Sequence, residues 1–146
     1  MKVVNEMKLS VPSLSVNEGV VRSVVAAFCA QVNPDAIDIA DVKCAVSEAV
    51  TNCIVHGYKG GIGAINVSIK LYSDNNVKIT VKDKGVGIAD VKMARQPLFT
   101  TDAENERSGM GFTVMESFMD KLSVRSAIGK GTAVTMCKRL NGIHNV

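Results

Sequence analysis

Glu48 and Asn52 are four residues apart in a stretch whose apolar residues recur with a helical period. Four residues make about one helical turn, so both side chains lie on one helix face, and His56 continues the row. A carboxylate accepts protons, and a neutral amide oxygen suits a hard Mg²⁺ ion that keeps water and phosphate oxygens as its other ligands. The solvated side of an amphipathic helix would show the same spacing, so the pair alone leaves both interpretations open.

A second group of polar and flexible residues follows a predicted strand, in the segment Asp83-Lys84-Gly85-Val86-Gly87. An ionised aspartate only accepts hydrogen bonds, which suits the exocyclic amine of adenine. Glycines at 85 and 87 let the backbone turn tightly and approach a flat base. An ordinary turn at the end of a strand has the same composition, so this segment is also ambiguous when taken alone.

Two glycine-rich segments stand later in the chain, Gly109-Met110-Gly111 before a predicted helix and Gly129-Lys130-Gly131-Thr132 between two predicted strands. Free amides at a helix start favour phosphate, whereas backbone packing and a plain hairpin turn are the alternatives. The first segment lacks the third glycine of a dinucleotide fingerprint and follows no N-terminal strand. The second lacks the Lys-Ser/Thr pair of a P-loop.

Composition bounds the class of protein. The 146 residues correspond to one domain, residues 1–146, and 47% of them are hydrophobic, enough for a core. The net charge is +3, no Lys/Arg run exceeds two residues and aromatics make up 4%, which argues against a nucleic-acid partner. The cysteines form no CxxC pair, which argues against zinc. Without a signal peptide or an apolar run of about 18 residues, we expect a cytoplasmic protein and no membrane contact.

The elements that must position these residues follow from hydrophobic periodicity. Period-2 alternation over 65–72 and 77–82, joined by 73–76, predicts a β-hairpin with one buried face. A helical period predicts a helix from Ser15 to about Val32, with Ser15 and Glu18 as a capping box. A second helix is predicted from about Ile39 to His56, with Asp38 as its N-cap.

The remaining elements are shorter. Helices are predicted over 89–95 and 110–120, strands over 7–11, 122–126 and 132–138, and a polar loop over 98–108. Because the strands alternate, the helices should cover only one face of the sheet. The predicted fold class is therefore α+β, a two-layer sandwich with a mixed, mostly antiparallel sheet.

Taken in order, the four segments resemble the N, G1, G2 and G3 boxes of the gyrase/histidine-kinase-type ATPase superfamily. This resemblance implies the histidine-kinase-like ATPase fold, with ATP or ADP and Mg²⁺ as cofactors and an ATP lid at about 96–108. It assigns the metal to Asn52 and the adenine to Asp83. The other residues that it places around the nucleotide are Gly85, Gly87, Ser108, Gly109, Gly111 and Thr132.

Longer motifs resemble the anti-sigma F factors of sporulating bacteria, over residues 5–139. These motifs are Ser47-Glu48-Ala49-Val50-Thr51-Asn52 with His56-Gly57-Tyr58, Arg95-Gln96-Pro97-Leu98-Phe99-Thr100-Thr101, and Glu106-Arg107-Ser108-Gly109-Met110-Gly111-Phe112. The family is one of serine kinases that also inhibit a sigma factor. The short Gly-x-Gly of the G2 box matches these small kinases and argues against a sensor histidine kinase.

The resemblance also implies roles for individual residues. Glu48 would accept the proton of an incoming serine hydroxyl, and Arg107 would contact the γ-phosphate unless it is a solvated loop arginine. The substrate would be a serine of an anti-anti-sigma factor, and sigma factor F would be held by a homodimer. The resemblance places Glu18 and Arg22 at the partner surface, although an exposed intrahelical ion pair has the same spacing. An ATP-dependent sigma-binding module without catalysis remains the alternative.

Overall fold

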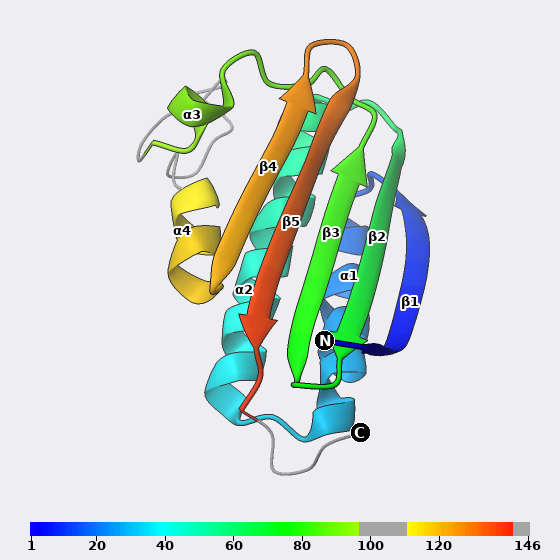
Figure 1. Ribbon diagram of the computed structural model, residues 1–146. Coiled ribbons are helices and arrows are strands. Elements are labelled where there is room, and N and C mark those ends of the chain that lie inside the picture. The colour runs from blue at the N-terminus through cyan, green and yellow to red at the C-terminus, as the bar shows by residue number, and fades with distance from the viewer. Residues whose placement is uncertain (97–110, 142–146) are drawn as a thin grey trace.

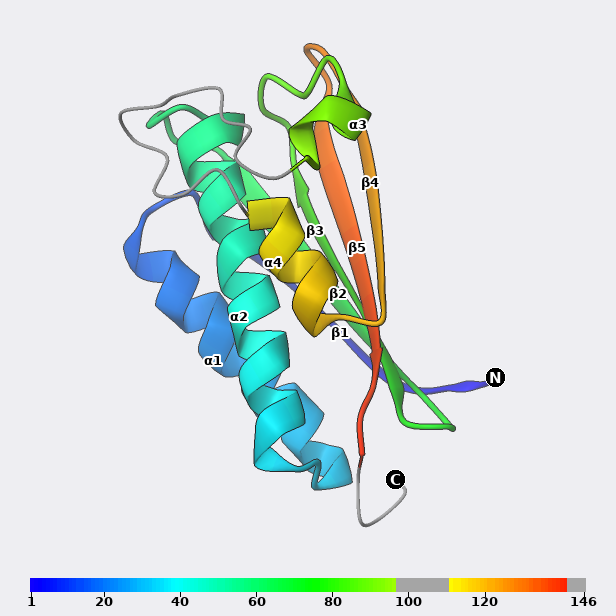
Figure 2. The ribbon, with the colours of Figure 1, turned by 90° about the vertical axis from the view of Figure 1, so that its left-hand side faces the viewer.

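The computed structural model describes residues 1–96 and 111–141. It is an α+β sandwich in which a five-stranded sheet, in the order β1-β2-β3-β5-β4, is covered by helices on one face (Figures 1 and 2). The strands are β1 (Val3–Pro12), β2 (Ala64–Tyr72), β3 (Asn76–Asp83), β4 (Lys121–Ala127) and β5 (Gly131–Arg139). The helices are α1 (Val16–Cys29), α2 (Ala36–Asn52), α3 (Val91–Ala94) and α4 (Gly111–Phe118). The predicted two-layer class is confirmed, and each described strand pairing is antiparallel.

The core lies between the sheet and the helices α1, α2 and α4. Alternation along β2 and β3 turns every second residue inward, and the register sets Val67 opposite Val81 and Ile69 opposite Ile79. These four side chains are at most 2% exposed. Full burial of such a side chain contributes about 1.5–3 kcal/mol, so the hairpin fixes the plane on which the helices rest.

The beginning of α1 differs from the predicted capping box. Ser15 occupies the N-cap position, but its hydroxyl makes no cap hydrogen bond within the described part of the chain. Glu18 instead accepts a hydrogen bond from Ser47 of α2 and lies 3.4 Å from the Arg22 guanidinium. A contact between two helices has replaced the local one, so the capping-box prediction was wrong.

The beginning of α2 lies three residues earlier than predicted. Asp35, not Asp38, is the N-cap, because its carboxylate accepts the Asp38 amide at 2.8 Å. Asp38 is thereby left to face the sheet, where its carboxylate accepts the Asn141 amide at 2.7 Å. The chain had two aspartates suitable as caps, and the tertiary contact decides between them.

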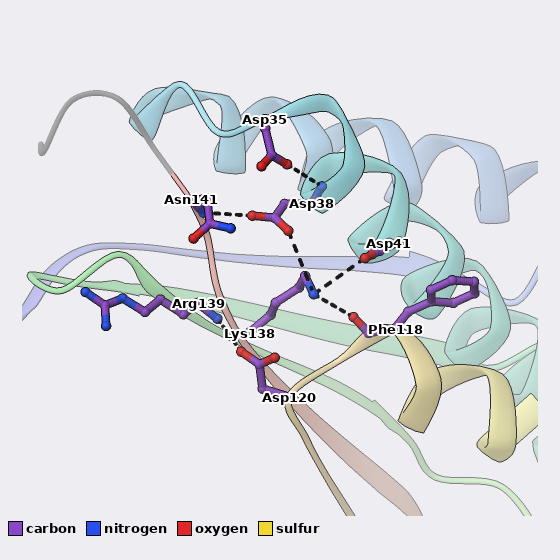
Figure 3. A network of polar contacts seen from close by, with 8 residues as sticks. All are labelled: Asp35, Asp38, Asp41, Phe118, Asp120, Lys138, Arg139 and Asn141. Atoms are coloured by element: carbon purple, nitrogen blue, oxygen red, sulfur yellow. Dashed lines mark hydrogen bonds and ion pairs between the residues drawn. The ribbon is translucent and has the colours of Figure 1, made fainter.

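A buried lysine joins this end of α2 to the sheet and to α4 (Figure 3). The Lys138 ammonium donates to the Phe118 carbonyl at 2.9 Å. It also lies 3.5 Å from an Asp41 carboxylate oxygen and 3.9 Å from an Asp38 oxygen. Lys138 is 9% exposed, so a cation is held away from water by two carboxylates and a carbonyl.

The other end of α2 widens before it stops. Residues Cys53–Gly57 form a π-helical turn, in which the Tyr58 amide bonds the Cys53 carbonyl at 2.9 Å. The predicted helix to His56 is therefore regular only to Asn52. In the described part of the chain, no helix is long and apolar enough to cross a membrane.

Candidate nucleotide-binding site

The predicted site residues that the structure describes, apart from Glu18 and Arg22, meet at one end of the sandwich. Figure 1 shows the end of the sandwich where α2 and β3 both end and where β4 turns into β5. Gly111, the first residue of α4, lies beside Glu48 and Asn52 of α2, and Gly131 at the β4–β5 turn lies beside Asp83. Arg107, Ser108, Gly109 and the lid beyond Gln96 lie outside the described residues, so their predicted roles stay predictions.

The side chains of Glu48 and Asn52 both face Gly111, the first residue of α4. A Cβ atom on Gly111 would lie 3.2 Å from Asn52 Nδ2, 3.3 Å from Asn52 Oδ1 and 3.4 Å from Glu48 Oε2. A side chain at 111 would crowd the carboxylate and the amide. The structure thus brings together the N-box pair and one glycine of the predicted phosphate segment.

The chemistry of this pair fits a magnesium ion that arrives with a nucleotide. In the described residues, no three His, Cys, Asp or Glu side chains gather as a protein-only metal cage would require. An amide oxygen at Asn52 is a hard neutral ligand, and Mg²⁺ typically takes only one or two protein ligands beside phosphates and water. The donor set at this position therefore suits Mg²⁺ held largely by phosphate oxygens.

Asp83 ends β3 and lies opposite Thr132 of β5 in the register. Its side chain points to the helix-covered face, and the residue is only 3% exposed. The Gly85 amide donates to Asp83 Oδ1 at 2.8 Å, and Gly57 is so close that a Cβ there would lie 2.9 Å from Oδ2. A carboxylate has about four acceptor positions, so the Gly85 amide leaves capacity for an adenine amine.

The Cys53 thiol also borders this carboxylate. Burial raises the pKa of Cys53 well above its usual range, and the negative charge of Asp83, which accepts a hydrogen bond from the thiol, raises it further. The thiol is therefore neutral at physiological pH and acts as a donor to Asp83.

Gly85 and Gly87 make close backbone contacts in addition to any contact with a base. A Cβ on Gly85 would lie 2.1 Å from the Gly57 carbonyl oxygen, and one on Gly87 would lie 2.1 Å from the Ala127 carbonyl oxygen. Gly87 also has a φ of +78°, in the left-handed region. The two glycines let the turn after β3 sit between the end of the π-turn and the β4–β5 turn.

Thr132 is supported by Ser126, which sequence reasoning missed. The Ser126 hydroxyl donates to the Gly131 carbonyl at 2.9 Å and accepts the Ile88 amide at 2.7 Å. Its proton is thus used, so Thr132, whose Oγ1 lies 2.8 Å away, donates to Ser126. Thr132 itself lies opposite Asp83 in the β3–β5 register.

Glu18 and Arg22 lie away from this group, on α1. Arg22 has 41% of its side chain exposed and Glu18 has 22%. The contact between Glu18 and Ser47 connects this pair to the residue that precedes Glu48. Sequence spacing gave the ion pair but no sign of the serine, because the two residues belong to different helices.

Comparisons with known proteins identify the family to which the chain is similar. Residues 11–138 match the family model of the histidine kinase-like ATPase domain. The chain is 55% identical over 138 residues to an anti-sigma F factor of Thermoanaerobacter pseudethanolicus, covering 94% of this chain and 96% of that protein. It is 52% identical over 137 residues to an anti-sigma F factor of Geobacillus stearothermophilus, covering 92% of each.

Solved structures agree with this result. The RsbU and RsbW domains of Rv1364c from Mycobacterium tuberculosis match 98% of the chain with a TM-score of 0.68 and 25% identity, and the chain spans 34% of that structure. A blue-light activated histidine kinase domain of Erythrobacter litoralis matches 84% of the chain and 61% of its own length, with a TM-score of 0.56 and 19% identity, which supports the fold alone.

Proposed function

The chain belongs to the anti-sigma F factor family of histidine kinase-like ATPase domains, and from this premise we propose that it inhibits sigma factor F and phosphorylates an anti-anti-sigma factor. Phosphorylation would use Mg-ATP and a serine of the partner. The protein would act as a homodimer.

The observation that carries the proposal is the contact of Gly111 with both Glu48 and Asn52. It brings a carboxylate, an amide and the start of a helix together, although Gly111 lies far from the pair in sequence. Phosphoryl transfer depends mainly on positioning and on charge neutralisation, and these three features supply both.

Each residue of the site has its own role in this proposal. Asp83 accepts the adenine amine, Asn52 holds the metal, and the amides that begin α4 face the phosphates. The serine oxygen forms a bond to the γ-phosphorus while the bond from that phosphorus to ADP breaks. Glu48 takes the proton that the serine hydroxyl loses in this step. Mg²⁺, when bound, neutralises charge on the β- and γ-phosphates. Ser108 and Gly109 would extend the phosphate contacts, and Arg107 is proposed to reach the γ-phosphate.

The partner surface is proposed to include Glu18 and Arg22 of α1. The Arg22 side chain is 41% exposed, and its guanidinium lies beside the Glu18 carboxylate, which also accepts a hydrogen bond from Ser47. A fixed arginine loses less freedom on binding than a mobile one. This supports a role in binding, whereas an isolated surface ion pair would stabilise the helix by only about 0.3–0.5 kcal/mol.

An ATP-dependent sigma-binding module without catalysis is the alternative. It would need Asn52 and Asp83 but no carboxylate beside the phosphates, and Glu48 Oε2 stands beside Gly111. Incubation of the protein with γ-labelled ATP, Mg²⁺ and an anti-anti-sigma factor distinguishes the two. Label on a serine of the partner supports the kinase. ATP-dependent retention of sigma factor F without label on the partner supports the module.

A further inference from the structure

Tyr58, which has no role in the proposed function, stands where β2 and β3 separate. Its hydroxyl donates to the Ala64 carbonyl at 2.6 Å and accepts the Lys84 amide at 2.8 Å. Its ring lies against Gly63, where a Cβ would come within 2.2 Å of ring atom Cε1. One side chain therefore joins the first residue of β2 to the residue that follows Asp83.

The register of the hairpin shows what this hydroxyl replaces. The ladder runs from Leu71 opposite Val77 to Asn66 opposite Lys82, one step forward on one strand for each step back on the other. Two further steps would set Ala64 opposite Lys84. A direct backbone bond there would have a nitrogen–oxygen distance of about 2.9 Å. The Tyr58 oxygen instead stands between the two groups and bonds to each.

The turn after β3 is fixed by the same segment. The Val86 amide donates to the Gly57 carbonyl at 2.9 Å, and the Gly85 amide donates to Asp83 itself. Of three successive amides in this turn, two thus bind the Gly57–Tyr58 segment at the end of the π-turn. The position of the turn relative to Asp83 depends on where that segment lies.

We propose that Tyr58 is a positioning residue of the base site: its hydroxyl is a wedge that ends the β2–β3 ladder and sets residues 84–87 at the distance that an adenine ring needs. This inference rests on the proposed nucleotide site. It assigns no contact between Tyr58 and the nucleotide. It also explains why α2 widens before Gly57, because the π-turn carries the tyrosine to the edge of the sheet.

A tyrosine that only packs against the core would behave differently, and Tyr58→Phe separates the two roles. The variant keeps the ring on Gly63 and removes only the bridging oxygen. The Lys84 amide then pairs with Ala64 directly, and the turn moves toward β2. Tyr72→Phe is the matched control, since Tyr72 is the chain's other tyrosine and ends the same strand at its opposite end.

The experiment measures dissociation constants for Mg-ATP and for Mg-tripolyphosphate, which lacks the base. Tyr58→Phe should weaken the binding of Mg-ATP about tenfold and leave the binding of Mg-tripolyphosphate unchanged. Amide chemical shifts should change at residues 84–87 in this variant and not in Tyr72→Phe. Equal affinities for Mg-ATP in Tyr58→Phe and the parent protein would overturn the proposed role of the Tyr58 hydroxyl. An equal loss of affinity for Mg-ATP and Mg-tripolyphosphate would overturn it too. Failure of the parent protein to bind Mg-ATP would refute the proposed function, and the amide shifts would still test the wedge.

Gly63→Ala provides a second, independent variant. It keeps the hydroxyl but forces the ring away, because the added methyl group would overlap the ring. It should reproduce the selective loss of Mg-ATP affinity. Normal Mg-ATP affinity in Gly63→Ala, with the ring shown to have moved, would contradict the inference.

Discussion

The two ends of α2 both carry charged side chains in protected surroundings, but they use them in opposite ways. At the N-terminal end, the Lys138 ammonium donates to Phe118 and faces Asp38 and Asp41, so protein groups surround the cation (Figure 3). At the C-terminal end, Glu48 and Asn52 face a glycine. The first end surrounds a buried cation with protein groups, whereas the second places a carboxylate and an amide beside the residue without a side chain that begins α4.

This difference predicts that substitutions at the two ends change different measurements. At the Lys138 end they should lower the free energy of unfolding and leave chemistry per folded molecule intact. At the Glu48 end they should change nucleotide binding or phosphoryl transfer and leave stability nearly unchanged. A substitution at either end that changed both properties strongly would contradict the comparison.

Glu48→Gln should have the largest effect. The amide keeps the shape of the side chain but cannot take the serine proton, so single-turnover phosphorylation should slow by about 10²–10⁴-fold. Calorimetry should show ATP affinity near that of the parent protein, and thermal unfolding should be unchanged. Phosphorylation at the parent rate would remove Glu48 from the mechanism.

Lys138→Met should give the largest loss of stability. The substitution leaves the Asp38 and Asp41 carboxylates without their cation, at a cost of about 3–5 kcal/mol for a buried pair. Denaturant unfolding measures the loss, and Lys130→Met in the exposed β4–β5 turn is the matched control. Restored stability on adding Asp38→Asn and Asp41→Asn would show that the unpaired carboxylates caused it. A loss of ATP affinity in the folded variant would instead break the separation of the two ends.

The features that the sequence predicted depend on local patterns, and the features that it missed depend on tertiary contacts. The β2–β3 hairpin was predictable because alternation is a local pattern that one buried face enforces. The capping contacts of α1 and α2 were not, since Glu18 bonds Ser47 of α2 and Asp38 bonds the Asn141 amide, and both partners are distant in sequence. The roles of Ser126 and Tyr58 were invisible for the same reason, because each is defined by backbone groups distant in sequence.

Asn52→Ala should have a smaller effect than Glu48→Gln and Lys138→Met. Loss of the only proposed protein ligand for Mg²⁺ should weaken Mg-nucleotide binding by about a hundredfold, at the upper end of what loss of a supporting residue costs a metal site. Both partner activities should fall with it, since in the proposed function both depend on the nucleotide. Calorimetry with and without Mg²⁺ provides the check: the variant and the parent protein should differ strongly with the metal and little without it. Normal affinity in the presence of Mg²⁺ would refute the assignment of the pocket.

Arg22→Glu should have the smallest effect and the most selective one. Arg22 lies on α1, so reversing its charge should leave the Glu48 end and the Lys138 end unchanged. Reversal against an acidic partner surface loses an attraction and adds a repulsion, so sigma-factor affinity should fall by about 10–100-fold. Arg125→Glu makes the same change of charge at an exposed position on β4 and should retain sigma factor F. Arg22→Glu should bind ATP normally and elute as a dimer in gel filtration. In a pull-down, it should fail to retain the sigma factor. Retention of the sigma factor at the parent level would show that Arg22 only pairs with Glu18, and that the proposed partner surface lies elsewhere.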